Sequence, residues 1–236
     1  MTALLTSSQL LEDGTINPAN GFLEALEQSL APLGTWLMIC SDPDRHERTE
    51  RHAQVEFAAL EALGYRCRSR AILDGRNPEE AGRLVAQADL IVLGGGHVPT
   101  QNRFFQRIGL RALLQDYPGL VLGISAGSMN SARTVYAQPE LPGESTDPGY
   151  SRFLPGLGLT DVMILPHYQM TREEMLDGKR LFEDITYPDS MGRCFYAIPD
   201  GSYISCGNGT VLHGEGWRIA QGQCRKVSAP GQCLSL

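Results

Sequence analysis

Gly119-Leu-Val-Leu-Gly-Ile-Ser-Ala-Gly-Ser-Met-Asn-Ser-Ala132 carries the strongest structural signal in this chain. Its apolar run 120–122 predicts a buried strand. Gly123 and Gly127 flank Ser125 at minus two and plus two, which matches the G-x-S-x-G pattern of a sharp strand-to-helix turn. Glycines suit such a turn because neighbouring backbone must approach without a Cβ in the way. The segment therefore predicts a hydroxyl at the end of a strand, beside the free N–H groups of a helix N-terminus.

A short motif of this kind has two interpretations. Ser125 can be a catalytic nucleophile, or it can cap the helix, since serine is a preferred capping residue. The motif alone does not distinguish a nucleophile from a helix cap, so the choice depends on the rest of the sequence.

Composition narrows the class of protein. The chain has 236 residues, of which 42% are hydrophobic and 20% charged, as is usual for a globular protein. We expect one domain over residues 1–236, because no internal repeat or linker interrupts the sequence. The net charge of −7 argues against nucleic-acid binding, which generally needs a basic surface.

The sequence shows little sign of a targeting segment, a membrane helix or a metal-binding motif. The first five residues lack the basic region of a signal peptide, and no apolar run reaches the length of a membrane helix. The six cysteines form no C-x-x-C pair and no zinc-finger spacing with histidine. We therefore expect a cytoplasmic protein with free thiols, no membrane contact, no metal and no cofactor.

The first half of the chain alternates apolar strands with helices. This order predicts a mostly parallel sheet with helices on both faces, whose sites lie beyond the C-terminal strand ends. Strands are expected at 3–5, 35–40, 65–73, 89–93 and 120–122, and helices at 21–33, 47–63, from 77 and at about 100–115.

The second half is less regular. Residues 138–157 are rich in proline and glycine and predict a long surface loop, a type of segment that is often functional. Strands are expected at 161–165 and 195–198, with a charged amphipathic helix at 172–185 between them. Antiparallel strands that close the sheet are expected at 203–206, 210–213 and 217–219.

Polar or glycine-rich tips follow four of these strands. They are the glycine turn at 94–96, Ser125, His167 and Asp200. A serine nucleophile needs a base, and the base needs an acid that fixes its tautomer, so His167 and Asp200 are the candidate partners. The bare backbone of the glycine turn can supply one N–H of an oxyanion hole, with the N–H of Ala126 as the other.

Other residues compete for these roles. The charged segment 45–51 predicts a solvated helix face, and His46 and His52 on this charged helix are expected at the surface. His213 lies among the antiparallel strands. His97 follows the glycine turn and can contact substrate or pack in the core. The remaining alternatives for the acid are Glu183, Asp184 and Glu215.

The chain order serine, histidine, acid differs from the α/β-hydrolases, in which the acid precedes the histidine. Four segments, 94–96, 123–127, 166–168 and 199–201, give the chain its resemblance to the peptidase E family of aspartyl dipeptidases and to the related cyanophycinases. The resemblance implies a class I glutamine amidotransferase-like (flavodoxin-like) fold over most of the chain. It also implies Ser125 as nucleophile, His167 as base, Asp200 as acid, and Gly96 and Ala126 as the oxyanion hole.

Two positions depart from the family pattern. Asp200 stands where aspartyl dipeptidases carry glutamate, and His97 stands where the family usually has asparagine. We therefore expect a serine peptidase that hydrolyses short peptides, with its side-chain preference open. The alternatives are hydrolysis of another acyl substrate, such as a cyanophycin-like polymer or an ester, and a non-catalytic binding protein. A glutamine amidotransferase is disfavoured because that chemistry uses a cysteine at this turn. The sequence leaves the oligomeric state open, with a homodimer as one arrangement to test.

Overall fold

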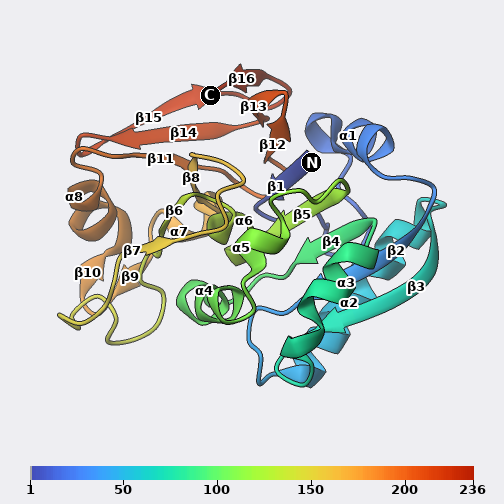
Figure 1. The fold of residues 1–236 in the computed structure, drawn as a ribbon. Helices are drawn as coiled ribbons and strands as arrows, with labels where there is room; N and C mark the ends of the chain where they lie inside the picture. The colour runs from blue at the N-terminus through green and yellow to red at the C-terminus, as the bar shows by residue number, and fades with distance from the viewer. Residues whose placement is uncertain (1) are drawn as a thin grey trace.

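The largest element of the protein is an eight-stranded sheet with the order β16-β13-β12-β1-β5-β4-β2-β3, shown in Figure 1. The structure is a computed structural model that describes residues 2–236. Met1, the first residue of the predicted domain, lies outside the described residues. The five strands from β1 to β3 run parallel, and β12, β13 and β16 extend the sheet antiparallel. The strands are β1 (Thr2–Thr6), β2 (Leu33–Ile39), β3 (Arg66–Leu73), β4 (Leu90–Leu93), β5 (Leu120–Ile124), β12 (Tyr203–Gly207), β13 (Gly209–His213) and β16 (Cys233–Ser235).

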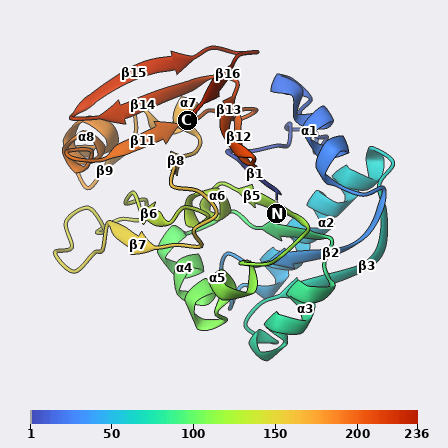
Figure 2. The same cartoon turned by 45° about the horizontal axis from the view of Figure 1, so that its top comes forward.

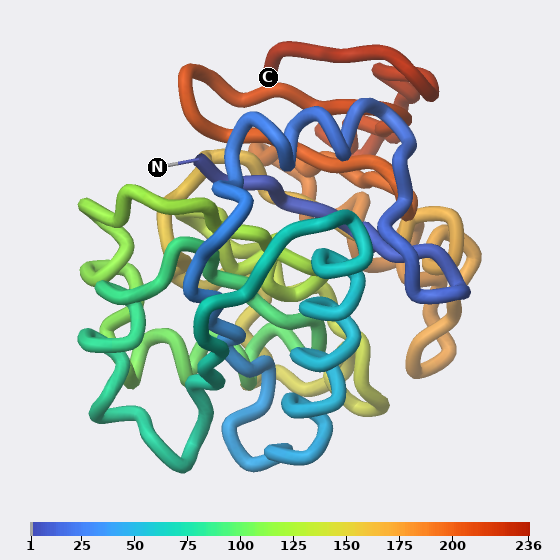
Figure 3. The backbone as a smooth tube through the Cα atoms, turned by 90° about the vertical axis from the view of Figure 1, so that its right-hand side faces the viewer, coloured from blue at the N-terminus to red at the C-terminus, as the bar shows by residue number. Residues whose placement is uncertain are grey.

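Helices cover both faces of the parallel part. Trp36 and Phe57 pack in the core under α1 and α2, whereas Ile91 and Phe105 belong to the core under α3, α4 and α5. Figure 3 shows α1 and α2 lying in front of the sheet. Burial on both faces explains why β4 and β5 are continuously apolar, and the predicted fold class is confirmed. The helices are α1 (Phe22–Ser29), α2 (His46–Ala62), α3 (Ala81–Gln87), α4 (Val98–Arg107) and α5 (Leu110–Leu113).

A second sheet lies beside the first, with the order β15-β14-β11-β8 (Figure 2). The expectation that residues 217–219 would close the main sheet is wrong, because β14 pairs with β11 instead. The chain leaves the main sheet after β13, where Gly214 adopts a positive φ of 92°. Ile219 is then buried against Phe195 in a core of its own. The strands are β8 (Met163–Leu165), β11 (Cys194–Ala197), β14 (Gly216–Ala220) and β15 (Gln223–Ser228).

The helix expected at 172–185 is also wrong. The segment forms a hairpin, in which Asp177 and Gly178 adopt positive φ values of 52° and 78°. An Asp-Gly pair favours such a two-residue turn, and this local preference overrides the helical spacing of apolar residues. The segment comprises α7 (Tyr168–Thr171), β9 (Met175–Leu176), β10 (Lys179–Arg180), a π-helical stretch (Leu181–Thr186) and α8 (Tyr187–Asp189).

Two other predicted segments are each interrupted in the structure. The helix expected at about 100–115 is interrupted at Gly109, whose φ is 65°, and continues as α5. The predicted loop 138–157 is irregular except at its end, where β7 (Phe153–Pro155) pairs with β6 (Thr134–Tyr136). Among residues 2–236, no helix is long and apolar enough to cross a membrane.

Candidate active site

Ser125 lies on a strained turn between β5 and the short helix α6 (Ala126–Asn130). Its φ of 50° and ψ of −110° are uncommon for a residue with a side chain, and its N–H donates to the Thr6 carbonyl at 3.0 Å. A Cβ on Gly127 would overlap the carbonyl oxygen of Leu93, so glycine is required where α6 crosses β4. This is the predicted strand–turn–helix, with the backbone strain that is often stored at functional sites.

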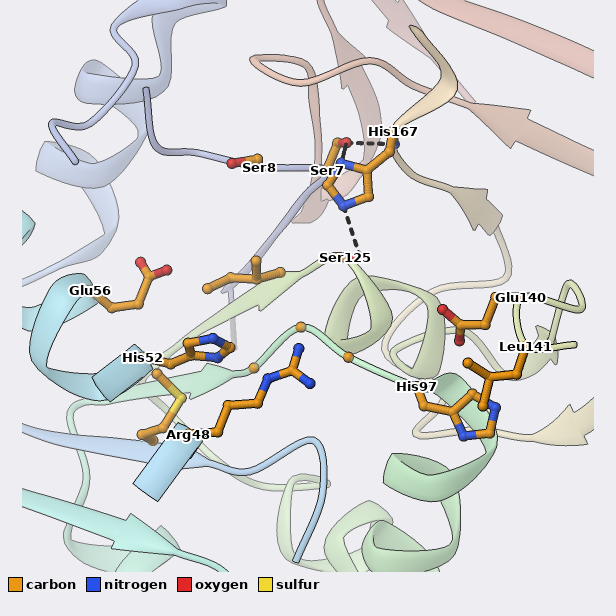
Figure 4. A pocket seen from close by; sticks show the side chains of 15 residues that line it. Ser7, Ser8, Arg48, His52, Glu56, His97, Ser125, Glu140, Leu141 and His167 are labelled. Carbon is orange, nitrogen blue, oxygen red and sulfur yellow. Dashed lines mark hydrogen bonds between the residues drawn. The ribbon is translucent and has the colours of Figure 1, made fainter. Parts of the chain in front are cut away.

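The structure brings His167 and Asp200 to Ser125. His167 follows β8 and Asp200 follows β11, so both come from the second sheet, whereas Ser125 comes from the first. His167 Nε2 lies 3.0 Å from Ser125 Oγ, and His167 Nδ1 lies 2.8 Å from Asp200 Oδ1. Figure 4 shows the imidazole directly above the serine. His167 also has a positive φ, 57°, which turns its side chain back toward the sheet junction.

Ser7 and Gln169 are partners that the sequence interpretation missed. The buried Ser7 hydroxyl donates to Asp200 Oδ1 at 2.6 Å and accepts the His167 backbone N–H at 2.7 Å. The Gln169 amide donates to Asp200 Oδ2 at 2.7 Å, and its Oε1 accepts the Asp200 N–H at 3.1 Å. Ser7 directly follows the apolar strand β1. Its position after a strand end is the same signal that indicated the other candidate residues, so this signal could also have indicated Ser7.

These contacts set the charge of Asp200. Burial alone would raise its pKa, but hydrogen bonds from His167, Ser7 and Gln169 outweigh that effect. The pKa of Asp200 therefore lies below its ordinary value, and the carboxylate is ionised at neutral pH. An ionised acceptor at Nδ1 leaves the proton on that nitrogen and the lone pair on Nε2, which faces the serine.

Gly96 and Ala126 are positioned beside Ser125. A Cβ on Gly96 would lie 2.5 Å from Ser41 Oγ, so the turn can pass only as glycine. The neighbouring Gly95 packs against the serine itself, because a Cβ there would lie 3.4 Å from the Ser125 Cβ. Ala126 is the first residue of α6, so its N–H has no acceptor within the helix. The assignment of these two N–H groups to an oxyanion hole stays a prediction.

A cavity of about 530 Å³ opens in front of Ser125. Arg48 is exposed, as the solvated face predicted for segment 45–51 requires, but it also lines this cavity together with His52 and Glu56 of α2 (Figure 4). Sequence reasoning missed them because charged residues at helical spacing usually face solvent. A second cavity of about 260 Å³ lies on the other side of Ser125, between the loop 138–157 and α7.

His97 lines the larger cavity, but both of its ring nitrogens are engaged. Nδ1 lies 2.8 Å from Thr100 Oγ1, and Nε2 lies 2.8 Å from Glu144 Oε1. The Glu144 carboxylate also accepts the N–H groups of Glu140 and Leu141, at 3.0 Å each. His97 therefore ties the glycine turn to the loop 138–157, and direct contact with substrate stays a prediction.

The alternative residues are bonded elsewhere. His213 contacts Ser205 at 2.8 Å, away from the serine. Asp184 pairs with Arg180, and Glu215 pairs with Lys226. Glu183 has no contact with His167 among the interactions of residues 2–236. Within the described part of the chain, no group of three or more His, Cys, Asp or Glu side chains is placed to hold a metal ion.

The fold and the serine turn define an α/β protein with a serine at the strand-to-helix turn that follows a central parallel strand. The family model for peptidase family S51 matches residues 7–213, so the chain belongs to that family and is a serine-type peptidase. No curated protein matches the sequence.

Two solved structures share the fold over nearly their whole length. A crystal structure of a peptidase from an acI-B1 Actinobacterium has a TM-score of 0.65 at 20% identity, and the match covers 100% of this chain and 96% of that one. A putative peptidase E from Listeria monocytogenes EGD-e has a TM-score of 0.59 at 18% identity, with 96% and 98% covered. At these identities the similarity establishes the architecture, and the chemistry has to be argued from the site.

Proposed function

We propose that the protein hydrolyses short peptides through a Ser125–His167–Asp200 triad and an acyl-enzyme. The observation that carries the proposal is the continuous hydrogen-bonded chain from Ser125 Oγ to the Asp200 carboxylate, with distances of 3.0 and 2.8 Å. Such a chain gives a serine the base and the oriented tautomer that nucleophilic attack needs.

Each group has one part in the proposed reaction. Ser125 Oγ attacks the scissile carbonyl while His167 Nε2 accepts its proton, and Asp200 stabilises the resulting imidazolium through Nδ1–H. The N–H groups of Gly96 and Ala126 bind the oxyanion, a role for which each donor contributes about 3 kcal/mol. His167 then protonates the leaving amine, and a water molecule activated by the same imidazole hydrolyses the acyl-enzyme.

The shape of the site supports a small substrate. Residues of the loop 138–157, including Glu140 and Leu141, border the cavity opposite α2, so the site is bounded on both sides. A volume of about 530 Å³ falls within the range of small-molecule pockets, roughly 300–1,000 Å³. Dipeptides and tripeptides are therefore the first substrates to test, ahead of folded proteins or long polymers.

The test is a panel of dipeptides varied at the first residue, with ester and cyanophycin substrates beside them. We expect release of amino acids by the wild type, and a loss of about 10³-fold or more in kcat/KM for Ser125→Ala. Ser128→Ala is not a suitable control, because its buried hydroxyl supports the turn through the Thr6 carbonyl. Ser69→Ala, on the exposed strand β3, serves instead and should keep full activity. Undiminished hydrolysis by Ser125→Ala would remove the serine from the mechanism.

A further inference from the structure

Two side chains of α2 face the active-site cavity without a protein partner. Arg48 and His52 are one helical turn apart, so they lie on the same side of the helix. Neither the Arg48 guanidinium nor the His52 ring takes part in a hydrogen bond or ion pair among residues 2–236, whereas the neighbouring Arg45 and Arg51 pair with Asp42 and Glu47. In Figure 4 the guanidinium extends from α2 toward the glycine turn that passes below Ser125.

The charges around the cavity are unevenly distributed. Arg48 and His52 form the wall on the α2 side, and Glu140 lies on the opposite side, with Ser125 between them (Figure 4). One Glu140 oxygen accepts the Val98 N–H at 3.2 Å, and the second is free to interact with a ligand. Glu140 also lines the smaller cavity, where Glu174 adds another carboxylate. A ligand that complements both sides has a negative group toward α2 and a positive group toward the loop.

Glu56 is the one carboxylate on the α2 wall. Burial raises its pKa to about 7, and the Gln9 amide donates a hydrogen bond to it. Glu56 is therefore partly neutral near pH 7. His52 has a pKa below its ordinary value, because of burial and then of the Arg48 and Arg51 charges, so it can donate an N–H as a neutral ring. Arg48 supplies the full positive charge of this wall.

We propose that Arg48, assisted by His52, binds the free C-terminal carboxylate of a short peptide, on the leaving-group side of the scissile bond. The inference rests on the proposed peptidase function of Ser125. A guanidinium binds a carboxylate through two parallel N–H donors, which fixes the orientation of the ligand as well as its charge. The peptide then lies across Ser125 with its amine toward Glu140. Arg48 thus selects substrates that end one or two residues beyond the cleaved bond.

The test compares substrate pairs that differ only at the carboxylate. The first pair is the best-hydrolysed dipeptide of the panel and its C-terminal amide. The second pair carries glutamate or glutamine as the second residue, so that an acidic side chain is tested separately from the chain end. Arg48→Gln removes the charge, and Arg51→Gln is the matched control on the same helix, outside the cavity.

We expect the wild type and Arg51→Gln to favour the free acid over the amide by about tenfold or more in kcat/KM, as for a hydrogen-bonded charged group. Arg48→Gln should lose this preference through slower cleavage of the acid, with the amide changed less than twofold. An equal effect of Arg48→Gln on acid and amide, or no effect on either, overturns the inference. A preference that follows the glutamate side chain also overturns it and assigns Arg48 to a side-chain pocket.

Calorimetric titration of the Ser125→Ala variant with the same peptides separates two kinds of failure. Binding that depends on Arg48, without hydrolysis by the wild type, contradicts the proposed function and leaves the carboxylate site standing. Hydrolysis that depends on Ser125, without discrimination by Arg48, contradicts the carboxylate site alone.

Discussion

Ser7 is a buried hydroxyl that links two members of the proposed triad. It binds the Asp200 carboxylate and the His167 backbone N–H at once, so it fixes the distance between the two strand ends. The sequence pointed to Ser125, His167 and Asp200 as candidates, because each follows an apolar strand within a short motif, and the structure places the three side chains together. The sequence did not indicate Ser7 or Arg48, since serines after strands and arginines on charged helices are common at positions that have no role in catalysis or binding.

Ser7→Ala tests this positioning role. The substitution leaves the His167 N–H without an acceptor and removes one donor to Asp200, so we expect kcat to fall about tenfold with KM nearly unchanged. Steady-state kinetics on the best dipeptide provide the measurement. Ser205→Ala on β12, whose hydroxyl contacts His213, is the control and should keep the wild-type values. A higher KM at constant kcat would instead show that Ser7 contacts substrate.

At the scale of elements, the β9–β10 hairpin supports the loop 138–157. Asp177 at the hairpin turn accepts the N–H groups of Gly143 and Ser145 and the Ser145 hydroxyl, at 2.8, 3.1 and 2.8 Å. These hydrogen bonds hold the pKa of Asp177 below its ordinary value. The sequence predicted the loop but put a helix at the hairpin, because the spacing of apolar residues over 172–185 is typical of an amphipathic helix. Contacts between two irregular segments carry no periodic signal that a sequence can reveal.

Asp177→Ala should release the loop from the hairpin. We expect faster amide hydrogen exchange confined to residues 138–157, and a severalfold higher KM, because Glu140 and Leu141 border the cavity. Asp116→Ala, which removes an exposed carboxylate before β5, is the matched control and should change neither quantity. Unaltered exchange in the loop would show that the Asp177 hydrogen bonds are not needed to hold it in place.

At the scale of the whole molecule, the site exists only where the two sheets meet. Ser125 and Ser7 extend from β5 and β1 of the main sheet, and His167 and Asp200 extend from β8 and β11 of the second. The parallel half was predictable because its inner strands β1, β4 and β5 are buried on both faces and are therefore largely apolar. The division of the C-terminal strands between two sheets was not predictable, since a half-buried strand has the same alternation of apolar and polar residues in either sheet.

Glu56 makes the stability of the whole molecule depend on pH. Its pKa of about 7, raised mainly by burial, exceeds the ordinary value of 4.5, so the folded state holds this proton more tightly than the unfolded chain. The stabilisation is fully present below pH 4.5 and is lost as pH rises through 7. Glu56→Gln stays neutral and should raise the free energy of unfolding at pH 8 by up to about 3 kcal/mol, with little difference at pH 4.5.

Urea unfolding at both pH values measures this difference. Glu79→Gln, at an exposed position before α3, is the control and should follow the wild type at each pH. A destabilised Glu56→Gln at pH 8 would mean that the charged carboxylate and its Gln9 hydrogen bond stabilise the fold.

Covalent labelling by a fluorophosphonate, located by peptide mass spectrometry, tests the nucleophile most directly. The reagent phosphonylates a serine only where a base activates the hydroxyl and nearby donors receive the oxyanion. We predict one label per chain, on Ser125, and slow or absent labelling of the folded His167→Ala variant. Wild-type protein that stays unlabelled while folded, or that carries the label on another serine, would contradict the assignment of Ser125 as the catalytic residue.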